Sequence, residues 1–213
     1  MRNGKGRPIL SELSQLPFSQ ACENNKKPIL TELKSVFSSS TQVLEIGSGT
    51  GQHCVYFAKH LPHLTWQASD QSDYLPQLNS RIHIEGPENL LTAVELDVSK
   101  PWPSKQLPKN LDGLYSANTL HIMSESMVVD FFEGLGQYLN LHANVAIYGP
   151  FNYQGQFSSD SNAQFDLWLK QNNPQSGIRD IEWITSLASI QGLSLHTDTP
   201  MPANNRLLHF SRS

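Results

Sequence analysis

The sequence has few cysteines and little charge for its length. Among 213 residues it holds two cysteines, Cys22 and Cys54, and 16% charged residues with a net charge of −4 at pH 7. Two thiols so far apart exclude a disulfide framework and a cysteine-based zinc site, and they suit a reducing cytoplasm. We therefore expect no bound metal and predict a cytoplasmic location.

Long apolar runs and basic clusters are also missing. The chain has no run of about 18 apolar residues, as a membrane span needs, and residues 1–15 lack the apolar core of a signal peptide. The mildly acidic balance argues against nucleic acid or an anionic membrane as a partner. The length predicts about one domain. We expect residues 1–20 to be a mobile leader and residues 21–213 to form that single domain.

What the sequence does contain is a strand-like run that leads directly into three alternating glycines. Val43 to Ile46 is followed by Gly47, Gly49 and Gly51, and residues 52–61 then carry apolar side chains at helical spacing. Strand, glycine turn and helix open a nucleotide-binding βαβ unit. The glycines allow a ligand to lie against bare backbone beside the helix N-terminus.

The spacing of the glycines narrows the choice of ligand. A dinucleotide fingerprint needs glycine where Gln52 stands, and the Gly-Lys-Ser/Thr end of a P-loop is missing. An acidic residue at Glu45, one spacer and the alternating glycines resemble motif I of class I S-adenosylmethionine-dependent methyltransferases. The alternative is a glycine turn in another kind of α/β domain.

Predicted strands and helices alternate along the rest of the chain, which indicates an α/β fold. An amphipathic helix ending at Phe37 is expected to have Pro28 in its first turn. The polar residues 154–162 are interpreted as an exposed, mobile loop. Further strands are expected at 64–70, 92–96, 111–116, 143–148, 193–199 and 206–210, and further helices at 72–84, 127–139, 163–170 and 180–191.

Two acidic residues follow the second and third predicted strands. Asp70 lies about twenty residues beyond the glycines, the distance at which a carboxylate meets ribose hydroxyls, although a turn or helix-capping aspartate would look the same. Asp97, with Val98 beside it, ends the third strand. In the superfamily that the glycine motif resembles, such an acid meets the adenine amino group and its neighbour packs on the ring; a simple turn residue is the alternative.

The loop after the fourth strand contains Asn118 and His121. Loops at this position of an open α/β sheet lie at the switch point where ligands bind, so these two side chains are candidates to face the methyl donor. Asn118 could instead cap the turn, and His121 could be a structural histidine. Tyr148 and Tyr153, around the end of the fifth strand, are candidates to contact or deprotonate an acceptor, although such aromatic residues are more often part of a core.

Seven segments together resemble one family, the small methyltransferase-like 26 family, which is also classified as a family of unknown function. The resemblance implies a class I methyltransferase sheet of seven mostly parallel strands in the order 3-2-1-4-5-7-6. One departure is Asn24, where the family commonly has arginine. The segments are ACENNKKPIL, VLEIGSGTGQH, LPHLTWQASD, ANTLHI, GPFNY, GIRD and MPANN.

The resulting hypothesis is an S-adenosylmethionine-dependent methyltransferase that acts on a small molecule. A catalytically silent S-adenosylmethionine-binding protein that works through a protein partner, or a protein methyltransferase, are the alternatives. We also expect Asn25, Lys26 or Arg179 near the cofactor carboxylate, and we take His121, Asn118 and Tyr148 as catalytic candidates. The residues expected to bind the cofactor are Asn25, Lys26, Glu45, Gly47, Ser48, Gly49, Gly51, Asp70, Gln71, Asp97, Val98 and Asn118.

Overall fold

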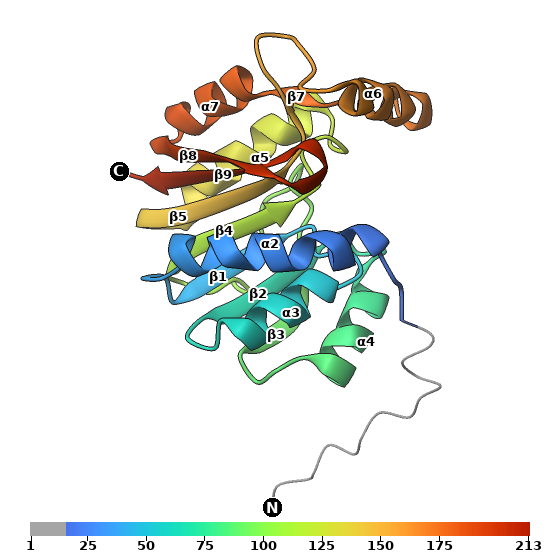
Figure 1. Ribbon diagram of the computed structural model, residues 1–213. Coiled ribbons are helices and arrows are strands. Elements are labelled where there is room, and N and C mark those ends of the chain that lie inside the picture. The colour runs from blue at the N-terminus through green and yellow to red at the C-terminus, as the bar shows by residue number, and fades with distance from the viewer. Residues whose placement is uncertain (1–15) are drawn as a thin grey trace, which may run out of the picture.

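A seven-stranded sheet forms the centre of the computed structural model, which describes residues 16–213 (Figure 1). The strand order is β3-β2-β1-β4-β5-β9-β8. The first five strands run parallel, and β9 and β8 pair antiparallel at one edge. The strands are β1 (Gln42–Ile46), β2 (Thr65–Asp70), β3 (Leu90–Glu95), β4 (Leu111–Ala117), β5 (Leu139–Gly149), β8 (Leu193–Met201) and β9 (Asn205–Arg212).

This arrangement confirms the predicted α/β class and the mostly parallel seven-stranded sheet. The order agrees with the predicted 3-2-1-4-5-7-6 when strands are counted within this sheet alone. It differs in one detail, because β6 (Phe151–Asn152) and β7 (Arg179–Asp180) pair with each other in a separate two-stranded sheet. The last two strands of the main sheet therefore carry the labels β8 and β9.

Helices cover both faces of the sheet, and each face has its own apolar core. Val43 of β1 packs on one side and its neighbour Leu44 on the other, as expected for a strand buried on both faces. The helices α2 (Gln20–Val36), α3 (Gln52–His60) and α4 (Leu75–Glu85) lie in front of the sheet in Figure 1, and α5 (Glu125–Tyr138) and α7 (Ile181–Ile190) lie behind it.

The helix α2 is longer than the sequence pattern predicts. It begins at Gln20, and the Ser19 hydroxyl caps it by accepting a hydrogen bond from the Cys22 backbone N–H at 3.3 Å. Pro28, predicted in the first turn, therefore lies in mid-helix, where it cannot donate to the Asn24 carbonyl. The turns before Pro28 border the cavity described below, and those after it are anchored in the core by residues such as Leu33.

The start of the described chain is held by a specific contact, and the turn before the last strand has left-handed backbone. The predicted leader falls mostly on residues 1–15, which lie outside the described residues, but the Pro17 carbonyl accepts a hydrogen bond from Arg81 Nη2 at 2.6 Å. In the turn between β8 and β9, Ala203 and Asn204 both have φ of 57°, a left-handed conformation that asparagine tolerates. Within residues 16–213, no helix combines the length and apolar character of a membrane span.

Candidate active site

A cavity of about 1120 Å³ lies at the carboxyl ends of the parallel strands. It borders the ends of β1 and β4, the point where β1 pairs with β2 on one side and with β4 on the other. Open α/β sheets bind ligands at this switch point. The predicted site residues that line it are Asn25, Gly47, Ser48, Gly49, Asp70, Gln71, Val98, Asn118, His121 and Tyr148.

The glycine loop forms one wall of the cavity. Gly49 has φ of +54°, and a Cβ atom added to it would meet no heavy atom within 4 Å, so open space begins at its backbone. Gly51 has a different reason to be glycine. An added Cβ there would lie 2.9 Å from Leu78 Cδ1 and 3.0 Å from Arg81 Cδ, so it allows α3 to pack closely on α4 and does not line the cavity.

Asp70 is placed as the sequence predicts, at the end of β2 and facing the glycine loop. Its Oδ2 accepts from the Gly49 N–H at 2.6 Å and its Oδ1 from the Gln71 N–H at 2.8 Å. Burial raises its pKa, while these two hydrogen bonds pull the pKa down. Among the described residues that line the cavity, Asp70 is the one carboxylate, and no lysine or arginine is among them.

Asp70→Ala is expected to weaken S-adenosylhomocysteine binding by about 1–3 kcal/mol, because ribose hydroxyls would lose a charged acceptor and the Gly49 N–H its partner. Asp70→Asn should lose less of the binding affinity, since the amide keeps one acceptor oxygen. Isothermal titration calorimetry measures both. Unchanged affinity in Asp70→Ala would reduce Asp70 to a turn residue.

Asp97 and Val98, which follow the end of the third strand, differ in position: Val98 lines the cavity and Asp97 does not. Val98 and the preceding Leu96 line the cavity, whereas the Asp97 carboxylate accepts from Ser99 and pairs with Lys100 Nζ at 3.1 Å. These contacts hold the pKa of Asp97 below its usual value. The apolar neighbours therefore offer an adenine ring its contact surface, and the predicted amino-group contact from Asp97 stays a prediction.

A buried hydrogen-bonded chain joins α2, α3 and β4 at the opposite side of the glycine loop. Asn25 Oδ1 lies 2.7 Å from His53 Nε2, and His53 Nδ1 lies 3.3 Å from the Tyr115 hydroxyl. Because an amide oxygen only accepts, Nε2 carries the proton and Nδ1 accepts from Tyr115. Burial lowers the pKa of His53 to about 4. His53 was not among the predicted site residues, although its place in the first turn after the glycines was a signal for it.

Two cations expected near the cofactor carboxylate lie elsewhere. Lys26 pairs with Glu23 and stands over the Tyr56 ring at 5.0 Å, because one residue of helix turns its side chain away from the face that Asn25 presents. Arg179 is buried behind the cavity wall. Its guanidinium donates to the backbone carbonyls of Met123 at 2.5 Å and Gln175 at 2.8 Å, so its donors serve the fold.

Glu45 is also removed from the cavity. It is 1% exposed, lies beneath the glycine loop and accepts a hydrogen bond from Trp66 Nε1 at 2.8 Å. Burial raises its pKa to about 7, although hydrogen bonds from Trp66 and Ser48 oppose the rise. The motif acid thus supports the loop from behind and does not border the cavity.

The loop after β4 brings Asn118 and His121 to the cavity as predicted. Asn118 has φ of 58°, a left-handed conformation that asparagine tolerates, and its N–H donates to the Tyr148 carbonyl at 2.8 Å. His121 is 5% exposed, and its ring stands edge-on to Phe165 with centroids 5.3 Å apart. Burial, and then the charge of Arg179, lower the pKa of His121 to about 4.

The two candidate tyrosines have different positions. Tyr148 lines the cavity, and burial raises its pKa against the effect of hydrogen bonds with Asn25 and Asn205. The Tyr153 hydroxyl donates to Asp198 Oδ2 at 2.6 Å and lies outside the lining. Its pKa is raised, first by burial and then by Asp198. Tyr153 therefore serves the C-terminal strand pair.

The remaining wall comes from α6 (Asp160–Asn172), which begins inside the stretch interpreted as an exposed loop. Ser159 caps this helix, and Asn162, 5% exposed, lines the cavity together with Phe165 and Trp168. The rings of Phe165 and Trp168 stack at 5.8 Å with 13° between their planes. No spacing in the sequence predicts that this helix lies across the strand ends.

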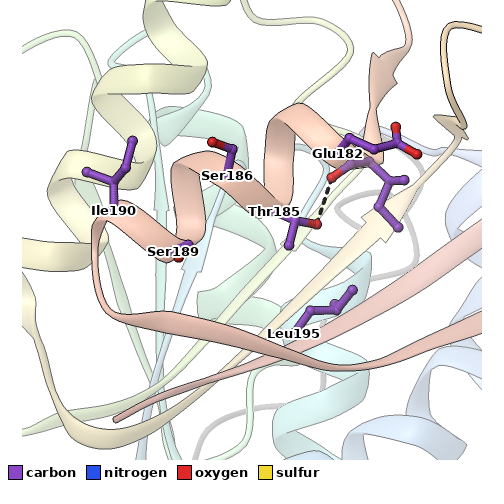
Figure 2. A pocket seen from close by; sticks show the side chains of 7 residues that line it. Glu182, Thr185, Ser186, Ser189, Ile190 and Leu195 are labelled. Carbon is purple, nitrogen blue, oxygen red and sulfur yellow. Dashed lines mark hydrogen bonds between the residues drawn. The ribbon is translucent and has the colours of Figure 1, made fainter.

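A second hollow of about 490 Å³ lies between α7 and β8 (Figure 2). It is lined by serines, isoleucines and Leu195, and Glu182 is its one ionisable side chain among the described residues. The Thr185 hydroxyl is already used, since it donates to the Ile181 carbonyl at 2.7 Å. Among the described residues that line this hollow, Glu182 has no second acid–base group beside it to form a catalytic pair.

A family model described as "Protein of unknown function (DUF938)" matches residues 16–212. The chain belongs to this family. The match spans the whole cavity, from Ser19 to Asn205.

Solved structures share this family member's fold. An O-methyltransferase family protein from Burkholderia thailandensis has a TM-score of 0.75 and 16% identity over 88% of this chain and 56% of its own. The S-adenosylmethionine-dependent methyltransferase SibL has a TM-score of 0.73 and 18% identity, over 99% of this chain and 63% of its own. NcsB1 is an O-methyltransferase from neocarzinostatin biosynthesis that was solved with S-adenosylmethionine and 2-hydroxy-5-methyl naphthoic acid. Its TM-score is 0.72 and its identity is 13%, over 91% of this chain and 55% of its own. The chain thus has the class I methyltransferase fold and spans 55 to 63% of these proteins.

Proposed function

We propose that this protein is an S-adenosylmethionine-dependent methyltransferase whose acceptor is a small molecule. The observation that carries the proposal is the pairing of Gly49 and Asp70 at the switch point: open space begins at the glycine backbone, and a buried carboxylate stands beside it. That pairing suits a ribose better than a phosphate, because the nearest charge is negative.

The rest of the cavity fits the same cofactor. Leu96 and Val98 offer apolar surface for adenine, and Asn25, whose amide oxygen contacts His53, offers its neutral amide N–H₂ group for the methionine end. The absence of lysine and arginine from the described lining keeps cationic repulsion away from a sulfonium. At about 1120 Å³, the cavity exceeds the roughly 300–1,000 Å³ of a typical ligand site, which leaves room for an acceptor beside the cofactor.

S-adenosylmethionine supplies an already activated methyl group, so the protein has mainly to align the acceptor and exclude water. We propose that the wall formed by His121, Phe165 and Trp168 aligns the acceptor, and that the first half of α2 shields the cofactor from water. The seven sequence segments given above support membership of the methyltransferase-like 26 group. We further propose a single domain at 21–213 and a cytoplasmic location, which agrees with the two free thiols.

The test is ligand-dependent stabilisation. S-adenosylhomocysteine at 100 times its Kd should stabilise the protein by about 2.7 kcal/mol by mass action, which raises Tm by roughly 5–10 °C for a chain of this size. NAD and ATP at the same concentration should leave Tm unchanged. A larger rise with NAD would contradict the assignment of the cofactor.

Transfer of label from methyl-labelled S-adenosylmethionine separates the alternatives. With cell extract as the source of acceptor, the proposal predicts label in the small-molecule fraction. Label in the protein fraction would favour a protein methyltransferase. Binding without transfer to either fraction would favour a catalytically silent protein that acts through a partner.

A further inference from the structure

We infer that the acceptor is an uncharged aromatic compound that presents a hydroxyl group to His121. The inference rests on the proposed function and adds to it the chemical class of the acceptor. Three features of the cavity carry it: an aromatic and thioether surface, a buried imidazole that faces it, and the guanidinium of Arg179 behind that imidazole.

The acceptor half of the cavity is apolar and suited to a flat ring. Phe165 and Trp168 stack on each other, and Phe165 stands edge-on to His121, so a planar ligand can add to this group. Thioether side chains adapt to the outline of an aromatic ligand. The apolar residues that line this half are Ile122, Met123, Met127, Pro150, Phe165 and Trp168.

His121 and the neighbouring Asn118 side chain are the polar groups of this half for which the described residues supply no hydrogen-bond partner, and His121 is the titratable one of the two. Its side chain is buried and lines the cavity, yet within residues 16–213 no hydrogen bond reaches either of its ring nitrogens. A buried polar group normally has a partner. Because burial, and then the charge of Arg179, lower the pKa of His121 to about 4, the imidazole is neutral at pH 7 and can accept a hydrogen bond from a ligand hydroxyl.

Charge disfavours ionised acceptors of either sign. The Arg179 guanidinium lies behind His121 and disfavours a protonated amine at that place. A carboxylate would gain no ion pair, since Arg179 is not part of the lining: its Nε and Nη2 donate to the carbonyls of Leu120, Met123 and Gln175, and its Nη1 lies 3.6 Å from Glu125 Oε1. An uncharged hydroxyl on an aromatic ring is desolvated at the lowest cost.

The transfer step balances with these groups. The hydroxyl oxygen forms the new bond to the methyl carbon, and the bond from that carbon to sulfur breaks with its electron pair left on sulfur. The hydroxyl proton passes to a ring nitrogen of His121 and from there to water.

Binding to protein saturated with S-adenosylhomocysteine tests this inference through a probe series. We would use phenol, 2-naphthol and a hydroxyanthracene as uncharged hydroxyl probes, with 2-naphthoate and 2-naphthylmethylamine as charged counterparts. Quenching of Trp168 fluorescence reports binding, and Trp168→Phe identifies the signal among the four tryptophans. At pH 7 we expect at least one hydroxyl probe to bind tenfold or more tightly than either charged counterpart.

Phe165→Ala and Leu167→Ala form a matched pair on α6. Phe165 lines the cavity, while Leu167 is 62% exposed and does not. Phe165→Ala should weaken binding of the best hydroxyl probe tenfold or more and leave the affinity for S-adenosylhomocysteine unchanged. Leu167→Ala should change neither affinity. Tighter binding of a charged probe, no binding of any hydroxyl probe, or equal effects of the two variants would overturn the inference. Failure of S-adenosylhomocysteine itself to bind would instead overturn the proposed function.

Discussion

Gly49→Val is expected to weaken S-adenosylhomocysteine binding about 100-fold or more, or roughly 3 kcal/mol. The Cβ position of Gly49 lies in open space that we assign to the ligand, so the protein can fold around the valine but the ligand cannot occupy the same volume. Asp70 would also meet a displaced Gly49 N–H. Isothermal titration calorimetry measures the loss.

Gly155 provides a matched control for this substitution. It has φ of +71°, close to the +54° of Gly49, and an added Cβ would also meet nothing within 4 Å, but it lies outside the cavity lining. Valine at either position bears a similar backbone cost of about 1–2 kcal/mol, so Tm should fall by comparable amounts. Affinity should fall only for Gly49→Val. Equal affinities in the two variants would show that the glycine loop does not contact the ligand.

His121→Ala is expected to lower methyl transfer by roughly 10²-fold or more, the usual effect of losing a general base, while affinity for S-adenosylhomocysteine stays nearly unchanged. The acceptor hydroxyl would lose its hydrogen-bond partner, because His121 is the histidine whose ring stands edge-on to Phe165 in the lining. Initial rates with the small-molecule fraction of a cell extract measure the effect.

His209→Ala is the control for removal of a partly buried histidine. His209 Nε2 lies 2.9 Å from Asn144 Oδ1 on the strand pair, and burial lowers its pKa as well, but it does not border the cavity. Its loss should affect Tm more than turnover. If His121→Ala lowered turnover and cofactor affinity equally, His121 would be a wall residue; if turnover were unchanged, Tyr148 or no base at all would have to serve.

Local sequence pattern was enough for residues that lie at the end of a predicted strand or directly follow it. The glycine loop, Asp70 and Asn118 follow the ends of strands, and the ends of parallel strands meet at one edge of a sheet. Their placement at the cavity could therefore be predicted before any contact was known.

Sequence pattern was not sufficient where side-chain orientation or tertiary placement decides which residues line the cavity. Lys26 is adjacent to Asn25, yet one step along a helix turns a side chain by about 100°, away from the cavity. Arg179 is far from the loop after β4 in sequence, so its use as a clamp on that loop could not be foreseen. Phe165 and Trp168 belong to a mostly polar helix whose position depends on contacts with the rest of the molecule.

The most direct measurement of the central claim is a crystal structure of the protein with S-adenosylhomocysteine. We predict that both ribose hydroxyls lie within hydrogen-bond distance of the Asp70 carboxylate, that adenine contacts Val98, and that the sulfur faces the space between His121 and Phe165. A ligand bound in the hollow between α7 and β8, or one in the cavity with its ribose away from Asp70, would contradict the account.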